Sequence, residues 1–266
     1  MYNFRYHKAS TIETAISLIE QSDDPKILAG GHTLIPTLKQ RLSQPTDIID
    51  ISSIDELKQI TLGEGNVTIG ALCTHAHISN SPEITKNIPG LADLAKQIGD
   101  PQVRHKGTVG GSIANADPAA DYPAAVLALN GEVLTSKENH FAANFFIDMF
   151  ETALKSNEII TGIRLQIPKS STYKKFRNPA SGYAMVGVFV ARYDNDVKIA
   201  VTGASSTVYR MEDIEGMLKS SFDNDIMEGI EIDTTDFNDD IHASAKYRGV
   251  ILKVLLEEAI LELKET

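Results

Sequence analysis

The sequence predicts an α+β protein with a larger N-terminal unit and a smaller C-terminal one. The chain has 266 residues, which exceeds one typical domain. Short segments of helical and strand-like apolar period alternate before Pro168, whereas β-rich segments begin near Ser170 and a long helix closes the chain. Hydrophobic residues make up 42% and charged residues 23%, ordinary values for a globular protein. We therefore place the boundary between the units near Pro168 to Thr172.

Helices and strands alternate in the first part of the N-terminal unit. Ser10 and Glu13 have the spacing of a capping box, and the apolar residues that follow predict a short amphipathic helix. The later elements are predicted from apolar period and from Gly and Pro at the ends of segments. They are a strand over 26–29, a helix over 34–42, strands over 47–51 and 67–72, a break at Ser81-Pro82, and a helix over 89–98 that Gly99 ends.

The second half of the chain is predicted in the same way. Residues 99–121 are rich in glycine and show no period, which predicts a long loop. A helix is expected over 124–129 and a strand over 159–167. Alternating apolar residues then predict a β-meander over 173–177, 184–193 and 197–202, with Asp194-Asn195-Asp196 as a hairpin turn. The last expected element is a helix over 244–263.

Charge and cysteine content exclude several classes of function. The net charge is −11, and no basic run supplies the face that nucleic-acid binding requires. Cys73 is the single cysteine, so neither an intrachain disulfide nor a cysteine-ligated iron–sulfur cluster can form from this chain alone. The longest apolar run, 124–129, is far shorter than the roughly 20 residues of a membrane helix. The N-terminus lacks a signal-peptide pattern, so we expect a cytoplasmic protein.

The first motif with chemical meaning is Ala29-Gly30-Gly31-His32-Thr33. A strand that ends in two glycines and leads into a helix brings free N–H groups close to a ligand, which suits a pyrophosphate. A tight strand-to-helix turn without a ligand explains the same residues. The chain has neither a G-x-G-x-x-G nor a Walker sequence, so no common nucleotide fingerprint supports the motif.

A second glycine pair stands in the segment from Thr108 to Asp121. Gly110-Gly111 again permits close approach of the backbone to a ligand. Hydroxyl, amide and carboxylate side chains surround the pair and could bind a polyol chain or a ring edge. These polar residues are Thr108, Ser112, Asn115, Asp117 and Asp121. Two such loops in one chain fit a dinucleotide held at both ends.

Four segments in this order make the chain resemble a known family. They are AGGHTLIPTLKQRL, TIGALCTHAHIS, IGDPQVRHKGTVGGSIANADPAADYPAAVLALNG and KFRNPASGYAMVGV. These motifs are similar to the FAD-binding medium subunit of the molybdenum hydroxylases, the family of aerobic carbon monoxide dehydrogenase and xanthine dehydrogenase. The resemblance extends over nearly the whole chain, down to Asp240 and the residues that follow it.

The resemblance implies an FAD-binding fold of the vanillyl-alcohol-oxidase (PCMH) type. Residues 1–170 would form the FAD-binding domain in two subdomains with a boundary near residue 55, and 171–266 a C-terminal α+β domain with an antiparallel sheet. By the same resemblance, the first loop cradles the pyrophosphate, the second contacts the flavin side, Asp121 bonds the cofactor, and two further residues approach the flavin. The implied cofactor-binding residues are Ala29, Gly30, Gly31, His32, Thr33, Thr108, Val109, Gly110, Gly111, Ser112, Asp121, Ile160 and Arg177.

The resemblance also implies a division of labour between chains. In the family, substrate is hydroxylated at a molybdopterin-bound molybdenum on a large subunit, and electrons cross two [2Fe-2S] clusters on a small subunit. FAD on this chain would pass them to a small-molecule acceptor, with no catalytic side chain needed. The benzoyl-CoA reductase branch carries a cysteine-rich loop that Cys73 alone cannot supply. The alternatives are a self-contained flavin oxidoreductase and a scaffold that has lost FAD.

Other candidate residues have plainer explanations. His75 and His77 would share one face of a strand, but no third ligand stands at matching spacing, so no metal is expected. Cys73 is expected to be a small buried residue and not a nucleophile. Asp117 and Asp121 could be a carboxylate pair of the glycosidase kind, but they lie in the flavin motif. Asp121 could also merely cap the helix that follows it.

Overall fold

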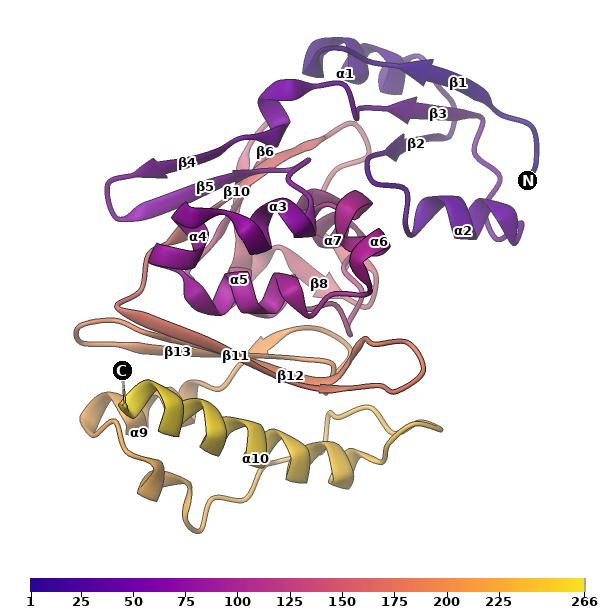
Figure 1. The fold of residues 1–266 in the computed structure, drawn as a ribbon. Helices are drawn as coiled ribbons and strands as arrows, with labels where there is room; N and C mark the ends of the chain where they lie inside the picture. Colours follow the sequence, from indigo (N-terminus) through magenta and orange to yellow (C-terminus); the bar gives the residue numbers. More distant parts are fainter. Residues whose placement is uncertain (266) are drawn as a thin grey trace.

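Three main sheets organise the fold, and they follow one another from the N-terminus to the C-terminus (Figure 1). The computed structural model describes residues 1–265. A parallel sheet lies at the N-terminal end, a five-stranded antiparallel sheet and its helices form the middle, and an antiparallel meander with two helices forms the C-terminal end. Helices and mostly antiparallel sheets together confirm the α+β class.

The N-terminal sheet has the order β1-β3-β2 and is parallel throughout. Parallel neighbours need crossover connections, which α1 and α2 provide together with their loops. Its elements are β1 (Arg5–Lys8), α1 (Ile12–Glu20), β2 (Pro25–Leu28), α2 (Leu34–Lys39) and β3 (Asp47–Asp50). The predicted capping box at Ser10 is wrong by one residue, because Thr11 is the N-cap and its side chain accepts from the N–H of Thr14.

The central sheet is antiparallel with the order β4-β5-β10-β6-β7. Its strands are β4 (Ile60–Gly63), β5 (Asn66–Gly70), β6 (Glu132–Thr135), β7 (Asn139–Phe141) and β10 (Ile160–Gln166). β10 inserts between β5 and β6, and its register places Leu165 opposite Val67, both buried. The sheet thus joins segments that are far apart in the sequence.

Six short helices connect β5 to β6. They are α3 (His75–Asn80), α4 (Pro82–Asn87), α5 (Pro89–Lys96), α6 (Pro101–Lys106), α7 (Val109–Asn115) and α8 (Tyr122–Ala128). α7 packs against β10 of the central sheet, whereas α5 and α8 pack against the C-terminal strands. The predicted long loop over 99–121 is therefore wrong, since it contains α6 and α7. α6 and α7 are too short to show an apolar period, and their signals in the sequence are the N-cap residues. Asp100 accepts from the Val103 N–H, and Thr108 accepts from the Gly111 N–H.

The predicted C-terminal meander is confirmed. Its strands are β11 (Ser170–Arg177), β12 (Ala184–Arg192), β13 (Val197–Thr202) and β14 (Tyr209–Arg210), followed by α9 (Glu212–Ser220) and α10 (Ala245–Lys264), which Ser244 caps. Val188 on one face of β12 belongs to the core shared with α10, whereas Phe189 on the other face belongs to the central core. Burial on both faces explains the nearly continuous apolar sequence of β12. The central core therefore extends across residue 170.

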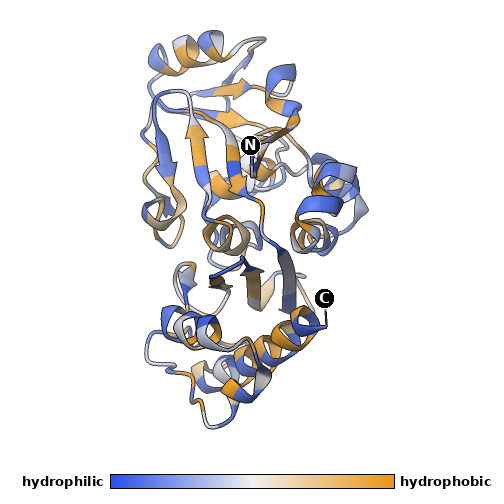
Figure 2. Cartoon of the chain, turned by 90° about the vertical axis from the view of Figure 1, so that its left-hand side faces the viewer, coloured by the Kyte–Doolittle hydropathy of each residue, from blue (hydrophilic) through white to orange (hydrophobic). Residues whose placement is uncertain are grey.

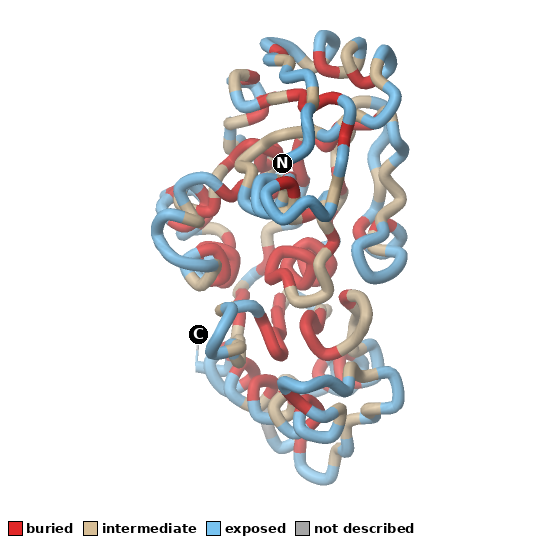
Figure 3. Tube along the Cα trace, turned by 90° about the vertical axis from the view of Figure 1, so that its right-hand side faces the viewer, coloured by how far each residue is buried: buried red, intermediate tan, exposed pale blue. Residues whose placement is uncertain are grey.

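The remaining elements are short. They are η1 (Asp55–Lys58), η2 (Ala142–Asn144), β8 (Phe146–Asp148), β9 (Glu151–Thr152) and η3 (Asn224–Met227). Apolar residues alternate with polar ones along several strands (Figure 2), and buried segments lie along the middle of the molecule (Figure 3). Within residues 1–265, no helix is both long and apolar enough to cross a membrane.

Candidate functional site

A cavity of about 950 Å³ lies where the N-terminal, central and C-terminal parts meet. Its walls come from the β2–α2 loop, the turn between α6 and α7, the segment from Phe150 to Ile160, and residues 181–183. Both glycine pairs of the sequence contribute to it. The volume lies near the upper end of the range for ligand pockets, which suits a large cofactor.

The first glycine loop presents backbone donors to this cavity. Gly31 has φ +75°, a left-handed conformation that favours glycine. The N–H groups of Gly31, His32 and Thr33 have no acceptor within the described residues, although all three residues line the cavity. Successive free N–H groups ahead of a helix bind anionic oxygens well. This loop therefore fits a phosphate or pyrophosphate.

Gly30 is required for a different reason. A Cβ built on Gly30 would lie 2.0 Å from the carbonyl oxygen of Lys106, at the end of α6. Glycine at this position lets the first loop pack directly on the turn that leads to the second loop. The sequence suggested that such glycines leave room for a ligand, whereas at Gly30 it is the protein backbone that fills the space.

The N–H groups of Val109, Gly110 and Gly111 in the second glycine loop are already paired within the protein. The N–H of Val109 donates to Cys73 and that of Gly110 to Ala71, while Gly111 donates to the Thr108 side chain. What it offers to the cavity are the side chains of Ser112 and Asn115, for which the described residues provide no hydrogen-bond partner. The two loops thus differ, with backbone donors on one and polar side chains on the other.

Asp121 lies in the cavity wall and is held by two residues of β11. Its carboxylate accepts from the Tyr173 hydroxyl at 2.5 Å and from the Lys175 ammonium at 2.9 Å. Burial raises the pKa of the Asp121 carboxyl, and the Lys175 charge counteracts this rise. Its side chain makes no capping hydrogen bond to α8, so the interpretation of Asp121 as a simple helix cap is wrong.

Lys175, which holds the Asp121 carboxylate without itself lining the cavity, was not predicted from the sequence. Its side chain is 1% exposed, which is rare for a lysine without a partner. The available signal was its place two residues after Tyr173 in a strand, because side chains at that spacing share one face.

His75 and Tyr122 form a second buried pair at the cavity. His75 Nδ1 lies 3.2 Å from the Tyr122 hydroxyl oxygen, and His75 lines the cavity.

His75 stands at the start of α3, so the predicted strand at this position is wrong. His77 is exposed, and residues two apart on a helix do not share a face, so the two imidazoles do not form a metal pair. Burial raises the pKa of Cys73 to about 11, which agrees with a buried thiol.

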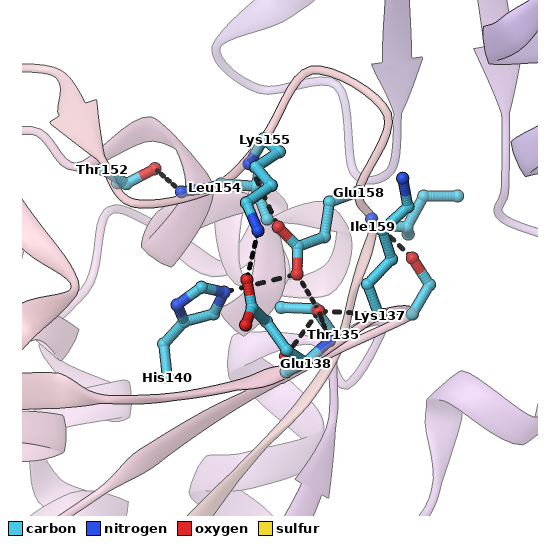
Figure 4. Close-up of polar contacts among 10 residues, drawn as sticks. Thr135, Lys137, Glu138, His140, Thr152, Leu154, Lys155, Glu158 and Ile159 are labelled. Atoms are coloured by element: carbon cyan, nitrogen blue, oxygen red, sulfur yellow. Dashed lines mark hydrogen bonds and ion pairs between the residues drawn. The ribbon is translucent and has the colours of Figure 1, made fainter.

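A polar network holds the segment of the cavity wall that precedes β10 (Figure 4). The buried Glu158 carboxylate accepts from the Thr135 hydroxyl, from the Lys155 N–H at 3.1 Å, and lies 3.3 Å from His140 Nε2. The Lys155 ammonium pairs with Glu138 beside it. Burial raises the pKa of Glu158, but these hydrogen bonds outweigh it and hold the pKa below its ordinary value. Glu138, His140 and Glu158 converge, and the lysine ammonium supplies the positive charge next to them.

Most of the residues that the sequence suggested for cofactor binding do line this cavity. They are Ala29, Gly30, Gly31, His32, Thr33, Thr108, Gly110, Gly111, Ser112, Asp121 and Ile160. Val109 is absent from the wall because its side chain lies in the central core. Arg177 is absent too, since its guanidinium donates to the Gln97 carbonyl at 2.7 Å. Asp117 also lines the wall, and its carboxylate accepts from the Ala119 N–H.

The donor set of the cavity fits FAD. The free N–H groups of the first loop suit the pyrophosphate, and Ser112 and Asn115 can bond hydroxyl groups or the polar edge of a ring. No buried cationic side chain is needed for the phosphates, because the backbone supplies the donors.

Comparisons with known proteins agree with this geometry. Residues 2–170 match the family described as the FAD-binding domain in molybdopterin dehydrogenase. The nicotine 6-hydroxylase medium subunit of Paenarthrobacter nicotinovorans is 34% identical, over 97% of this chain and 96% of its own. The carbon monoxide dehydrogenase medium chain of Hydrogenophaga pseudoflava is 35% identical, over 79% of this chain and 77% of its own. A crystal structure of Cu,Mo-CO dehydrogenase superposes with a TM-score of 0.87 at 26% identity, over 98% of both chains.

Proposed function

The chain belongs to the family of FAD-binding domains in molybdopterin dehydrogenase, and from this premise we propose that it transfers electrons as the medium subunit of a molybdenum hydroxylase complex. Membership confirms the fold and the cofactor class that the sequence motifs implied. The proposal goes further, because it assigns to the chain a place between iron–sulfur clusters on a partner and an external acceptor.

One observation supports the proposal most strongly. A single cavity joins three unpaired N–H groups on the first loop to free polar side chains on the second loop. This arrangement suits a molecule with an anionic centre and a polyhydroxyl or ring portion, as FAD has. A scaffold that had lost the cofactor would not require this arrangement, and FAD binding by the purified chain distinguishes it from the proposed function.

The residues of this chain would bind and orient the cofactor. The N–H groups of Gly31, His32 and Thr33 would hold the pyrophosphate, and Ser112 with Asn115 would hold the remainder. Lys175 would keep the Asp121 carboxylate ionised and in place in the cavity wall. Bound FAD supplies the redox chemistry by accepting and releasing electrons.

The cysteine content supports the need for partner chains. Cys73 is the only cysteine and is fully buried, so iron–sulfur clusters would have to lie on another chain. We expect a [2Fe-2S] small subunit and a molybdopterin large subunit, as in the complexes that the sequence resembles. A small-molecule acceptor would take the electrons from FAD.

Three measurements test the proposal. The purified chain should bind FAD with a flavin absorbance spectrum, and it should not oxidise purines, aldehydes or carbon monoxide with a dye acceptor. The same chain should be retained by its affinity-tagged iron–sulfur partner when both are expressed together. Turnover of such a substrate by the isolated chain would favour a self-contained flavin oxidoreductase, and failure to bind FAD would contradict the proposal.

A further inference from the structure

We propose that His75, fixed by Tyr122 in the tautomer that carries its proton on Nε2, donates a hydrogen bond to an oxygen of bound FAD at the junction of the two glycine loops. This assignment rests on the proposed function, because it requires FAD in the cavity. It adds a side-chain donor to a site whose first loop otherwise binds through its backbone.

The position of His75 is the first step of the argument. The backbone N–H of His75 donates to the Gly107 carbonyl at 3.0 Å, so His75 lies beside the turn that begins the second loop. A Cβ on Gly107 would lie 2.5 Å from His75 Nε2, and a Cβ on Gly30 would lie 3.0 Å from the Gly107 Cα atom. The Nε2 edge of the imidazole therefore lies next to the contact between the two loops.

The second step concerns which nitrogen is free. Nδ1 pairs with the Tyr122 hydroxyl, and no described residue offers a hydrogen-bond partner to Nε2. Among the described residues, the Tyr209 hydroxyl is the only side-chain nitrogen or oxygen that is fully buried and has no hydrogen-bond partner. His75 Nε2 also has no partner, so this atom is not fully buried and a ligand can reach it. Because His75 is only 5% exposed and lines the cavity, that access is from the cavity.

The third step fixes the proton. Tyr122 is fully buried, and its hydroxyl has no acceptor among the described residues other than His75 Nδ1. A buried hydroxyl that did not donate would lose its hydrogen bond at a cost of about 1–3 kcal/mol. Tyr122 therefore donates to Nδ1, and a neutral imidazole then carries its proton on Nε2, directed to the cavity.

The charge of the ring agrees with this geometry. Burial, together with the nearby His32 and Arg104, lowers the pKa of His75 to about 4. The imidazole is thus neutral at physiological pH, and its role is that of a fixed donor and not of a cation. The acceptor it suits is an oxygen of the pyrophosphate or of the ribityl chain.

Two substitutions separate this role from a structural one. In His75→Gln the amide nitrogen can occupy the place of Nε2 and keep a donor in the cavity. In His75→Asn the shorter amide can bond Tyr122 but cannot reach the cavity. We expect FAD affinity within about threefold of wild type for H75Q and a loss of about tenfold or more for H75N. Affinity is measured by flavin fluorescence titration, and the melting temperature of each apo-protein is measured alongside.

The tautomer gives a test that needs no substitution. The ¹⁵N shifts of the His75 ring in the wild-type chain should show Nε2 protonated and Nδ1 unprotonated, with the Nε2 signal moving when FAD is added. A proton on Nδ1 would overturn the assignment. So would equal FAD affinity of H75N and wild type, or equal losses in H75Q and H75N that follow their melting temperatures. A wild-type chain that binds no FAD would instead overturn the proposed function, and this assignment with it.

Discussion

The Lys175 ammonium contacts both carboxylate oxygens of Asp121, at 2.9 Å and 3.0 Å, although the two residues come from opposite sides of the predicted domain boundary. Both side chains are nearly inaccessible, at 1% and 4% exposure. The pair therefore joins the C-terminal sheet to the wall of the cofactor cavity, and its charges are screened little by solvent.

The Lys175→Met substitution tests this ion pair. It leaves a buried carboxylate without its cation, so we expect the free energy of unfolding to fall by about 3–5 kcal/mol, as measured by urea denaturation. The double variant D121N/K175M removes both charges and should recover a large part of that loss. A double variant no more stable than K175M would show that the charges do not stabilise each other.

The glycines of the two loops are expected to respond differently to alanine. In Gly30→Ala the new Cβ would meet the Lys106 carbonyl oxygen at 2.0 Å, so both stability and FAD affinity should fall. In Gly111→Ala the new Cβ would meet only the Thr108 hydroxyl at 3.0 Å, so the fold should survive. Because Gly111 lines the cavity, the added methyl group should lower FAD affinity.

Thermal unfolding of the apo-proteins and FAD titration distinguish the two effects. Gly216→Ala is the matched control, because a Cβ there meets nothing within 4 Å and the position is in a helix. That variant should keep FAD affinity and gain slightly in stability. A Gly30→Ala protein with wild-type stability would contradict the proposed contact between the loops.

The stability of the apo-protein should depend on the protonation of His75. Its folded pKa of about 4 lies below the ordinary value near 6.5, so the unfolded chain binds more protons between these values. The contribution is complete above about pH 6.5 and is lost as the pH falls towards 4, by about 3 kcal/mol at most. Urea denaturation at several pH values should show a steeper decline for wild type than for H75Q. The groups facing His75 are His32, Arg104 and Tyr122, all retained in that variant.

Glu158 is expected to stabilise the cavity wall more than its exposed neighbour does. Glu158→Gln replaces a buried acceptor of three hydrogen bonds and should lower the free energy of unfolding by about 1–3 kcal/mol. Glu138→Gln removes only the exposed pair with Lys155 and should cost less than about 1 kcal/mol. Denaturation curves of both variants decide this, and equal losses would refute the central place of Glu158 in the network.

Local signals in the sequence predicted much of the fold. The alternation of apolar residues predicted the meander from β11 to β13, and the predicted helix start at Ser244 coincides with the N-cap of α10. The 99–121 segment was predicted poorly because α6 and α7 are only six and seven residues long. A period cannot be established over so few residues, and caps alone are weak signals.

The sequence by itself determined the two glycine loops, their polar neighbours and the family to which the chain belongs. Only the tertiary structure decided that the loops touch at Gly30 and Lys106. The tertiary structure further decided that the first loop offers backbone N–H donors to the cavity, whereas the N–H groups of the second loop are already paired. It also decided the pairing of His75 with Tyr122, 47 residues apart, and of Lys175 with Asp121, 54 residues apart. Periodicity and turn residues report the local backbone, whereas these contacts depend on how distant elements pack, for which no single segment carries a signal.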